Sequence, residues 1–438
     1  MALEFDALQR NRTWRLVDRP PGANVVSGKW VFHHKLNPDG SLVRYKARWV
    51  VRGFTQRAGI DFGETFSPVV KPATIRTILA IAASNQWPTK QLDVSNAFLH
   101  GHLNEQVLCQ QPTGFVDADR PDIVCLLNKS LYGLRQAPRA WFTRFAGFVT
   151  KIGFKATRSD SSLFVFRRGT DIAYLLLYAD DIVLTGSSSA LLQHIVDCLR
   201  AEFAIKDMGV LRFFLGIDVK RTKDGFYLSQ ERYAEDILDR AGMTNYKPAS
   251  TPIDAKNKLA ADGPPTDNAT SYSSLAGTAQ FLTMTRPDIT FAVQQACLHM
   301  HDPRAPHMAF LKCILRYVHG MTLHGLLLRA STDLSVTAYS DADWVGCPDT
   351  RRSTLGFCVY LGDSLVSWSS KRQPTVSRSS AETEYRAVAN AAAECIWLRQ
   401  LLSELHCGIK KATVVFYDNV SAVYMSSNPV HHKLHQAH

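Results

Sequence analysis

The sequence predicts a mixed α+β protein built from two or three domains. A chain of 438 residues is too long for one ordinary hydrophobic core, and 46% hydrophobic residues is typical of globular proteins. Short apolar runs typical of strands alternate with segments of helical periodicity. Prolines among small polar residues at 247–268 indicate an exposed linker, and a weaker boundary falls near 329–333. We therefore expect a large first unit, a helical middle piece and a separate C-terminal unit.

The first unit is expected to contain both strands and helices. Residues 24–35 and 44–52 have the pattern of a basic β-hairpin, joined at the turn sequence 37–40. Residues 74–84 carry apolar side chains at helical spacing. Two short apolar strands, 172–178 and 182–185, lie on either side of the pair Asp180-Asp181.

The net charge and the cysteine pattern indicate which kind of partner and which cellular compartment to expect. Lysine and arginine outnumber aspartate and glutamate by 50 to 39, a net charge of +11. This excess favours a polyanionic partner, although many basic proteins bind no nucleic acid. Nine scattered cysteines without a Cys-x-x-Cys pair argue against a disulfide framework and a thiolate zinc site. With no signal peptide and no apolar run of roughly 20 residues, we expect an intracellular protein without a membrane partner.

The paired aspartates Asp180 and Asp181 suggest a metal site. Two neighbouring carboxylates repel each other, so the pair either occupies a solvated turn or holds a divalent cation such as Mg²⁺. Asp93 follows another short strand, in Gln91-Leu-Asp-Val. If that strand lies beside the Asp180-Asp181 hairpin, the three acids could hold two metal ions about 3.5–4 Å apart, as in-line phosphoryl transfer requires.

At this point the chain resembles a known family. Tyr178-Ala-Asp-Asp resembles the Tyr-x-Asp-Asp signature of reverse transcriptases, and residues 14–429 are similar to the Pol polyprotein of copia-class long-terminal-repeat retrotransposons. The phrases that carry this resemblance are Arg44-Tyr-Lys-Ala-Arg-Trp-Val-Val-Arg-Gly-Phe-Thr-Gln, Glu64-Thr-Phe-Ser-Pro-Val-Val, Gln91-Leu-Asp-Val-Ser-Asn-Ala-Phe-Leu-His-Gly, Ser130-Leu-Tyr-Gly-Leu-Arg-Gln-Ala-Pro-Arg-Ala-Trp, Phe214-Leu-Gly-Ile and Thr285-Arg-Pro-Asp-Ile.

The resemblance implies a fold and a set of site residues. The fold is a right-hand polymerase, with fingers and palm at 1–246 and a thumb-like connecting region at 247–334. Asp93, Asp180 and Asp181 would be the catalytic metal ligands. The substrate-binding residues would be the triphosphate cations Lys46 and Arg48, the steric gate Phe98, and the primer grip Phe214, Leu215 and Gly216. The alternative for Lys46 and Arg48 is a solvated charged strand, and the alternative for Phe98 is an ordinary core phenylalanine. For residues 214–216 it is a plain apolar strand. Ala179 departs from the larger residue usual in the family, so a looser site is expected.

The C-terminal unit carries a second set of acids. Strand-like runs at 336–344, 356–361 and 364–369 precede a helix that begins with the capping-box pattern Ser379-Ser-Ala-Glu382, and a further strand follows at 414–419. Taken alone, each acid is explained by solvation at a strand end or by its favourable interaction with the dipole at a helix N-terminus. The order of these strands, the helix and the acids at 335–438 resembles that of the ribonuclease H domain in copia-class retrotransposons. That resemblance implies Asp341, Glu384 and Asp418 as catalytic metal ligands, with Glu384 preferred to Glu382 because Tyr385 follows it.

The two ends of the sequence suggest a fragment. The chain starts just upstream of the polymerase region, and after Lys433 it departs from the family's continuation. We expect an incomplete ribonuclease H domain that lacks its last acid, and hypothesise a frameshift or misjoined exon near Lys433. The tail histidines are better explained as out-of-frame sequence than as a metal site; they are His431, His432, His435 and His438.

These features together predict an RNA-directed DNA polymerase with two Mg²⁺ ions per active site, or Mn²⁺ instead, and an uncertain ribonuclease H activity. The expected partners are an RNA template, a DNA primer, an RNA–DNA hybrid and deoxynucleoside triphosphates. The oligomeric state stays open, and so does location in a cytoplasmic particle or the nucleus. A catalytically dead nucleic-acid-binding remnant is the main alternative, and a folded remnant with neither property is another.

Overall fold

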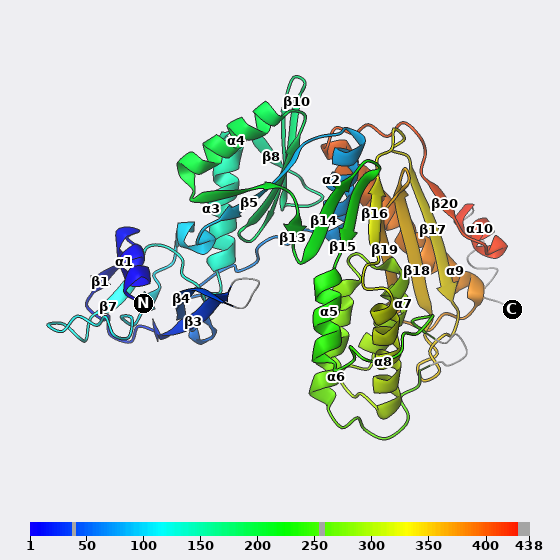
Figure 1. The fold of residues 1–438 in the computed structure, drawn as a ribbon, viewed down its shortest axis with the longest axis horizontal. Coiled ribbons are helices and arrows are strands. Elements are labelled where there is room, and N and C mark those ends of the chain that lie inside the picture. Colours follow the sequence, from blue (N-terminus) through cyan, green and yellow to red (C-terminus); the bar gives the residue numbers. More distant parts are fainter. Residues whose placement is uncertain (37–40, 254–258, 428–438) are drawn as a thin grey trace. The chain divides into compact units, whose positions relative to one another are not determined.

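The computed structural model describes residues 1–36, 41–253 and 259–427, and it has the mixed α and β content that the sequence predicts (Figure 1). The chain forms two compact units. Unit 1 comprises residues 1–70, 92–184 and 188–209, and unit 2 comprises residues 71–91, 185–187 and 210–438. Compactness does not define functional domains, so the predicted boundaries at residues 246 and 334 stay predictions. No helix within the described residues is both long and apolar enough to cross a membrane.

A small sheet and a long hairpin form the first part of unit 1. The helix α1 (Ala2–Arg10) precedes a sheet of order β1-β7-β6-β2, with strands β1 (Trp14–Val17), β2 (Val25–Val26), β6 (Leu108–Cys109) and β7 (Val124–Leu127). The predicted basic hairpin is confirmed as antiparallel strands β3 (Gly28–Leu36) and β4 (Leu42–Val51). The sequence predicts that its first strand begins at residue 24, but it begins at residue 28, because Val25–Val26 pairs with β6 in the small sheet instead. Its predicted turn at 37–40 lies outside the described residues.

A larger sheet carries the paired aspartates. Its strand order is β12-β5-β11-β10-β9-β8. The strands are β5 (Thr89–Val94), β8 (Phe154–Ala156), β9 (Leu163–Arg168), β10 (Asp171–Tyr178), β11 (Asp181–Gly186) and β12 (Ile205–Val210). The amphipathic helices α3 (Ala137–Lys151) and α4 (Ser189–Glu202) contribute to one core with the sheet, and η1 (Gly53–Thr55) and η2 (Ala97–His100) are short 3₁₀ turns. Neighbouring strands in this sheet place Asp93 and the Asp180-Asp181 turn side by side.

Unit 2 contains a second sheet and a helical cluster. The sheet has order β13-β14-β15-β16, with strands β13 (Phe213–Phe214), β14 (Ile217–Thr222), β15 (Gly225–Ser229) and β16 (Gly325–Arg329). One apolar core joins α5 (Glu231–Arg240), α6 (Ala269–Leu282), η3 (Pro287–Ile289), α7 (Thr290–Cys297) and α8 (Ala305–Gly320). The described residues of the predicted linker at 247–268 contain no helix and only one isolated bridge, between Pro265 and Arg304.

A buried arginine ties α2 (Pro72–Ser84) into unit 2. The guanidinium of Arg76 donates hydrogen bonds to the carbonyls of Val366 and Met284, each at 2.8 Å. It lies 3.8 Å from the ring centroid of Trp368. Burial lowers the pKa of Arg76 to about 9, and the nearby carboxylate of Glu394 opposes that shift. Such a charge is tolerable because it donates two hydrogen bonds and an aromatic face covers it.

The C-terminal part of unit 2 is a four-stranded sheet backed by a long helix. Its order is β19-β18-β17-β20, with β17 (Val336–Asp343), β18 (Thr354–Leu361), β19 (Ser364–Arg372) and β20 (Val414–Phe416). The first three strands are antiparallel neighbours, whereas β20 pairs with β17 in parallel. The helices are α9 (Ser380–Glu404) and α10 (Val420–Ser427). The strands and helix expected here are thus confirmed, while the tail after residue 427, with its four histidines, lies outside the described residues.

Candidate active sites

The first candidate site lies at the Asp180-Asp181 turn of unit 1. Strands β10 and β11 meet there, and Ala179 has a left-handed φ of 49°. A branched residue is strained more than alanine by such a φ, which is a local reason for a small residue at this position. The indole of Trp141 donates to the Ala179 carbonyl at 2.7 Å, and the backbone N–H of Val94 donates to the Asp180 carbonyl at 2.8 Å. These bonds hold the turn against α3 and β5.

The electrostatics show that the three predicted acids are neighbours. Burial, followed by repulsion from Asp180 and Asp93, raises the pKa of Asp181 to about 6. Carboxylates that disfavour one another's ionisation form a site where a cation would be favourable. Their oxygens are less closely gathered than those of the acids in unit 2, because they do not form a group within 4.8 Å of one another.

The basic residues predicted on the hairpin face the same site. The guanidinium carbon of Arg48 lies 4.9 Å from the ring centroid of Tyr132, and its buried Nε has no hydrogen-bond partner among the described residues. Burial and the nearby Arg48 and Arg44 lower the pKa of Lys46, whereas Glu4 and Asp93 oppose that shift. An unpartnered guanidinium donor near the acids suits a phosphate group.

Tyr132 connects these residues with Phe98, although sequence reasoning gave Tyr132 no role. The rings of Phe98 and Tyr132 meet edge to face at 5.6 Å, and the Tyr132 hydroxyl donates to Asn96 Oδ1 at 3.3 Å. Burial raises the pKa of Tyr132, and Asp180 adds to that rise while Arg48 opposes it. Tyr132 stood within the phrase 130–141, but its spacing from the acids could not indicate contact.

Glycine makes the close approach of Tyr132 to β4 feasible. Gly133 has a φ of 93°, and a Cβ there would lie 2.0 Å from the Val51 carbonyl oxygen. The backbone N–H of Val51 donates to the Tyr132 carbonyl at 2.9 Å. Any side chain at position 133 would therefore push Tyr132 and Arg48 apart.

The predicted primer-grip residues form a tight hairpin in unit 2. Phe214 is buried and pairs with Ile217, and the two loop residues Leu215 and Gly216 have φ values of 52° and 71°. Both positive angles are typical of a two-residue type I′ turn. These residues thus form a tight local turn rather than a plain strand, and their contact with a primer stays a prediction.

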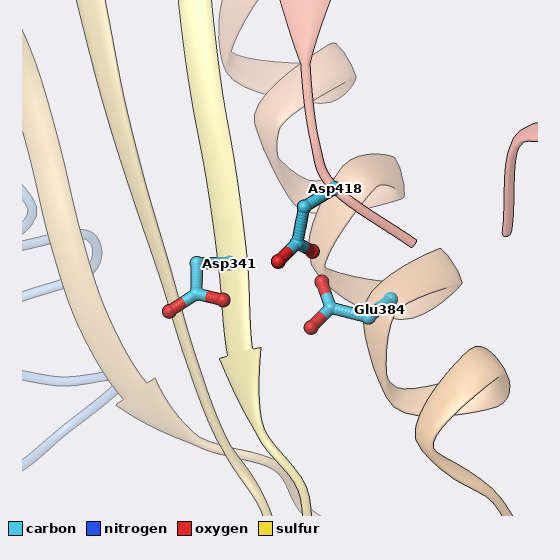
Figure 2. Close-up of side chains that lie close together, drawn as sticks. All are labelled: Asp341, Glu384 and Asp418. Carbon is cyan, nitrogen blue, oxygen red and sulfur yellow. The ribbon is translucent and has the colours of Figure 1, made fainter. Parts of the chain in front are cut away.

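The second candidate site is a compact group of three acids in unit 2. Figure 2 shows the side chains of Asp341 on β17, Glu384 on α9 and Asp418 beyond β20 lying close together. One oxygen from each lies within 4.8 Å of the other two. The parallel pairing of β20 with β17 brings Asp418 to Asp341, although 77 positions separate them in the sequence. This arrangement has the hard oxygen ligands that a divalent cation prefers.

Glu384 is the most constrained member of this group. It is only 6% exposed, and its Oε1 accepts a hydrogen bond from the backbone N–H of Ala342 at 3.1 Å. Its Oε2 is buried and has no hydrogen-bond partner among the described residues. Burial, repulsion from Asp341 and, less strongly, from Asp418 raise the pKa of Glu384 to about 7. An orphaned buried carboxylate oxygen beside two more acids fits a metal ligand.

The start of α9 presents Glu384 rather than Glu382 to the other acids. Ser379 Oγ accepts from the Glu382 backbone N–H at 3.1 Å, which caps the helix. In a capping box the Glu382 carboxylate would accept a hydrogen bond from the backbone N–H of Ser379. Here it accepts instead from the backbone N–H of Arg378, at 2.8 Å. Glu382 also pairs with Arg386 at 2.7 Å. The carboxylate of Glu382 is thus engaged in local contacts at the helix start.

A pocket adjoins Asp341. It has a volume of about 320 Å³ and is lined mainly by β17, β18, β19 and the start of α7. Asp341 and Asp343 lie beside the aromatic side chains of Tyr339, Phe291 and Trp368 in its wall. Asp341 is therefore accessible to a ligand from this pocket.

The pH dependence of unfolding should report on the acid cluster. The pKa of Glu384 is raised from an ordinary 4.5 to about 7 in the folded protein. Glu384 therefore ionises less readily in the folded state than in the unfolded state, and the folded state loses stability as the pH rises through this range. We expect the midpoint of thermal unfolding to fall more between pH 5 and pH 8 for the wild type than for Glu384→Gln. Millimolar Mg²⁺ should raise the midpoint of the wild type at pH 8 and have little effect on the variant. Equal pH and Mg²⁺ responses in both proteins would contradict this account.

Each of these acidic sites, taken by itself, offers the carboxylate oxygens that a divalent cation prefers. Residues 11–255 match the family described as reverse transcriptase (RNA-dependent DNA polymerase), so the chain belongs to that family.

Two similar proteins are named as retrovirus-related Pol polyproteins from transposons. The chain is 46% identical over 434 residues to the retrovirus-related Pol polyprotein from transposon RE2 of Arabidopsis thaliana, which covers 99% of this chain and 30% of that protein. It is 40% identical over 444 residues to the retrovirus-related Pol polyprotein from transposon TNT 1-94 of Nicotiana tabacum. That match covers 99% of this chain and 33% of the tobacco protein. The chain thus spans about a third of the length of these curated relatives.

Proposed function

We propose that the protein is an RNA-directed DNA polymerase of a copia-type retrotransposon, which adds deoxynucleotides to a primer. The observation that carries this proposal is the cluster of Asp93, Asp180 and Asp181, in which Asp181 has a pKa raised to about 6. Such mutual repulsion suits a pair of bound cations. Two Mg²⁺ ions, or Mn²⁺ ions, held by these acids would supply activation of the primer hydroxyl and neutralisation of the departing pyrophosphate.

Lys46 and Arg48 on β4 would hold the incoming nucleotide. Arg48 is fixed over Tyr132 with an unpartnered buried Nε, and Lys46 is electrostatically linked to Asp93. The two cations would grip the triphosphate and align its reacting phosphorus with the primer end. Phe214, Leu215 and Gly216 would hold the primer strand through their tight turn.

Phe98 would discriminate against ribonucleotides. Its ring packs edge to face on Tyr132, and its backbone carbonyl accepts from the Ser130 hydroxyl, so the side chain has little freedom to move. We expect Phe98→Val to increase incorporation of ribonucleotides relative to deoxynucleotides by about a hundredfold, because two methyl groups on Cβ replace the larger ring that excludes the 2′-OH. Single-nucleotide kcat/KM ratios would measure this. A ratio unchanged from the wild type would mean that Phe98 is an ordinary core residue.

The acid cluster of unit 2 supports a second activity. We infer that Asp341, Glu384 and Asp418 hold metal ions for hydrolysis of the RNA strand of an RNA–DNA hybrid. The antiparallel β17–β19 with parallel β20 and the adjacent α9 support a ribonuclease H-like domain at 335–438. Fingers and palm would occupy 1–246, and a thumb-like connection would occupy 247–334. On this assignment, one protein copies the template and degrades the RNA that it has copied.

The test is extension of a DNA primer annealed to an RNA template with deoxynucleotides and Mg²⁺. Extension that requires the RNA template would support the polymerase. Well-folded protein that binds the hybrid in a salt-sensitive way without extending the primer would favour the dead nucleic-acid-binding remnant. Unchanged mobility of the labelled hybrid at low salt would favour a folded remnant with neither property.

A further inference from the structure

A second pocket of unit 2 lies beside the buried Arg76. It has a volume of about 320 Å³ and is lined by the start of α2, the C-terminal part of α6, α7 and β19. Trp368 and its neighbours on β19 also line the pocket that adjoins Asp341, but none of the described residues of β17 or β18 lines this one. Its lining residues all belong to unit 2 and include no member of either acid cluster.

Arg76 brings a positive charge to the wall of this pocket without an ion pair. Its side chain is only 6% exposed. Nε and Nη1 donate to backbone carbonyls, whereas Nη2 has no hydrogen-bond partner among the described residues. Glu394 acts on the pKa of Arg76, but its carboxylate accepts a hydrogen bond from Ser367 Oγ at 2.7 Å and none from the guanidinium. A buried charge that lacks a counterion is stabilised by an anionic ligand.

The remaining polar lining offers donors rather than carboxylates. Lys371, near the end of β19, is exposed and makes no ion pair within the described part of the chain. Gln294 Oε1 accepts a hydrogen bond from Gln295 at 3.1 Å, and the amide nitrogen of Gln294 has no partner among the described residues. The described lining contains no aspartate or glutamate. Two cations and an amide donor therefore favour an anion in this pocket.

The pocket also has apolar walls. Met284, Val293 and Leu298 contribute hydrophobic side chains to its lining. The volume of about 320 Å³ is near the lower end of the roughly 300–1,000 Å³ that small-molecule sites occupy. The pocket therefore suits a small molecule that has an anionic head group and a short apolar body.

The two cations favour a phosphate monoester as the head group. Arg76 and Lys371 together carry two positive charges, and a phosphate monoester carries about −1.5 to −2 at neutral pH. A carboxylate would neutralise only one of the two cations. The three terminal oxygens of a phosphate can also accept from both cations and from the Gln294 amide at the same time.

We propose that this pocket binds a small organic phosphate monoester. The phosphate contacts Nη2 of Arg76 and the ammonium group of Lys371, and the apolar body packs against the hydrophobic walls. Because α2 and β19 then hold the same ligand, binding stabilises unit 2. The site uses no residue of the proposed polymerase or ribonuclease H sites, so it is independent of the proposed catalytic function.

Isothermal titration calorimetry with phenyl phosphate tests this site in the full chain. The buffer contains no divalent metal, so that no cation at the acid clusters binds the probe. We expect phenyl phosphate to bind at least about fivefold more tightly than inorganic phosphate, which lacks the ring, and benzoate, which lacks the second charge. Benzyl alcohol carries no charge and should not bind measurably.

Lys371→Met locates the ligand, since it removes the charge of an exposed side chain and leaves the core intact. We expect the Kd for phenyl phosphate to rise by about five- to tenfold. Lys312→Met makes the same change at an exposed lysine of α8 outside the pocket and should leave the Kd unchanged. Arg76→Gln should abolish binding. Because that variant also loses buried hydrogen bonds, its unfolding midpoint is measured first, and Lys371→Met decides the question if it does not fold.

Each result has a defined meaning. Weaker binding of phenyl phosphate in Lys371→Met, with unchanged binding in Lys312→Met, supports the site. Equal binding in these two variants overturns it, because the ligand then lies elsewhere. Equal affinity for phenyl phosphate and inorganic phosphate overturns the organic ligand. Displacement of phenyl phosphate by an RNA–DNA hybrid also overturns the proposal, since the pocket would then belong to a nucleic-acid surface. Binding of none of the probes overturns the site and leaves the proposed polymerase unaffected.

Discussion

Replacing Asp180 with asparagine is expected to reduce primer extension by a factor of about a thousand or more, because a lost metal ligand removes several kcal/mol of transition-state stabilisation. Hybrid binding should remain within a few-fold of the wild type, since binding depends mainly on the basic surface. The fold should also persist, because the turn is held by the Asp180 backbone carbonyl rather than by its side chain. Single-turnover extension and equilibrium binding, measured on the same preparations, separate these two effects.

Asp197→Asn is the matched control for this variant. Asp197 is a surface acid on α4 that accepts from Gln193 and lies 3.7 Å from Arg200, so the same chemical change is made away from the proposed site. Its extension rate should equal that of the wild type. If Asp180→Asn extends primers as fast as Asp197→Asn, Asp180 is not a metal ligand and the proposed site is wrong.

Glu384→Gln is expected to abolish cleavage of the RNA strand while leaving primer extension intact. The substitution keeps the shape of the side chain and its bond to Ala342, but it removes the charge that a cation would need beside Asp341 and Asp418. The loss should reach about a thousandfold. Cleavage of a hybrid with labelled RNA, assayed beside primer extension, would measure both activities in one protein.

Glu382→Gln provides an unusually close control. Glu382 lies two positions earlier on α9, and its carboxylate is engaged with Arg378 and Arg386. This variant should cleave RNA at nearly the wild-type rate, with at most a small loss of stability at the helix start. Full cleavage by Glu384→Gln, or loss of cleavage only in Glu382→Gln, would overturn the assignment of Glu384. If even the wild type does not cleave, the ribonuclease H proposal fails and the polymerase proposal is unaffected.

Local elements were predictable because their causes are local. The basic hairpin, the helical spacing at 74–84 and the cap at Ser379 each depend on residues close together in the sequence, and each is confirmed, although the hairpin begins at residue 28 rather than 24. The capping box shows the limit of this reasoning. Its serine half formed as predicted, but the carboxylate of Glu382 has a neighbouring donor, Arg378 N–H, within reach.

The sites were only partly predictable. Acids at strand ends identified Asp93, Asp180 and Asp181 as candidates, and the resemblance to a family supplied their roles. Tyr132 was missed, because its contacts with Arg48 and Phe98 depend on the backbone approach that Gly133 permits. No pattern in the sequence reports a contact of that kind.

The sequence by itself determined the family, the mixed class of fold and the candidate acids, since motifs and periodicity are properties of neighbouring residues. Only the tertiary structure decided which acids lie close enough to repel one another and how far their pKa values shift. It set the pKa of Asp181 at about 6 and that of Glu384 at about 7, and it placed Lys46 and Arg48 on one face of the hairpin. The physical reason is that desolvation and repulsion depend on distances across strands and helices, which exist only once distant segments have packed together.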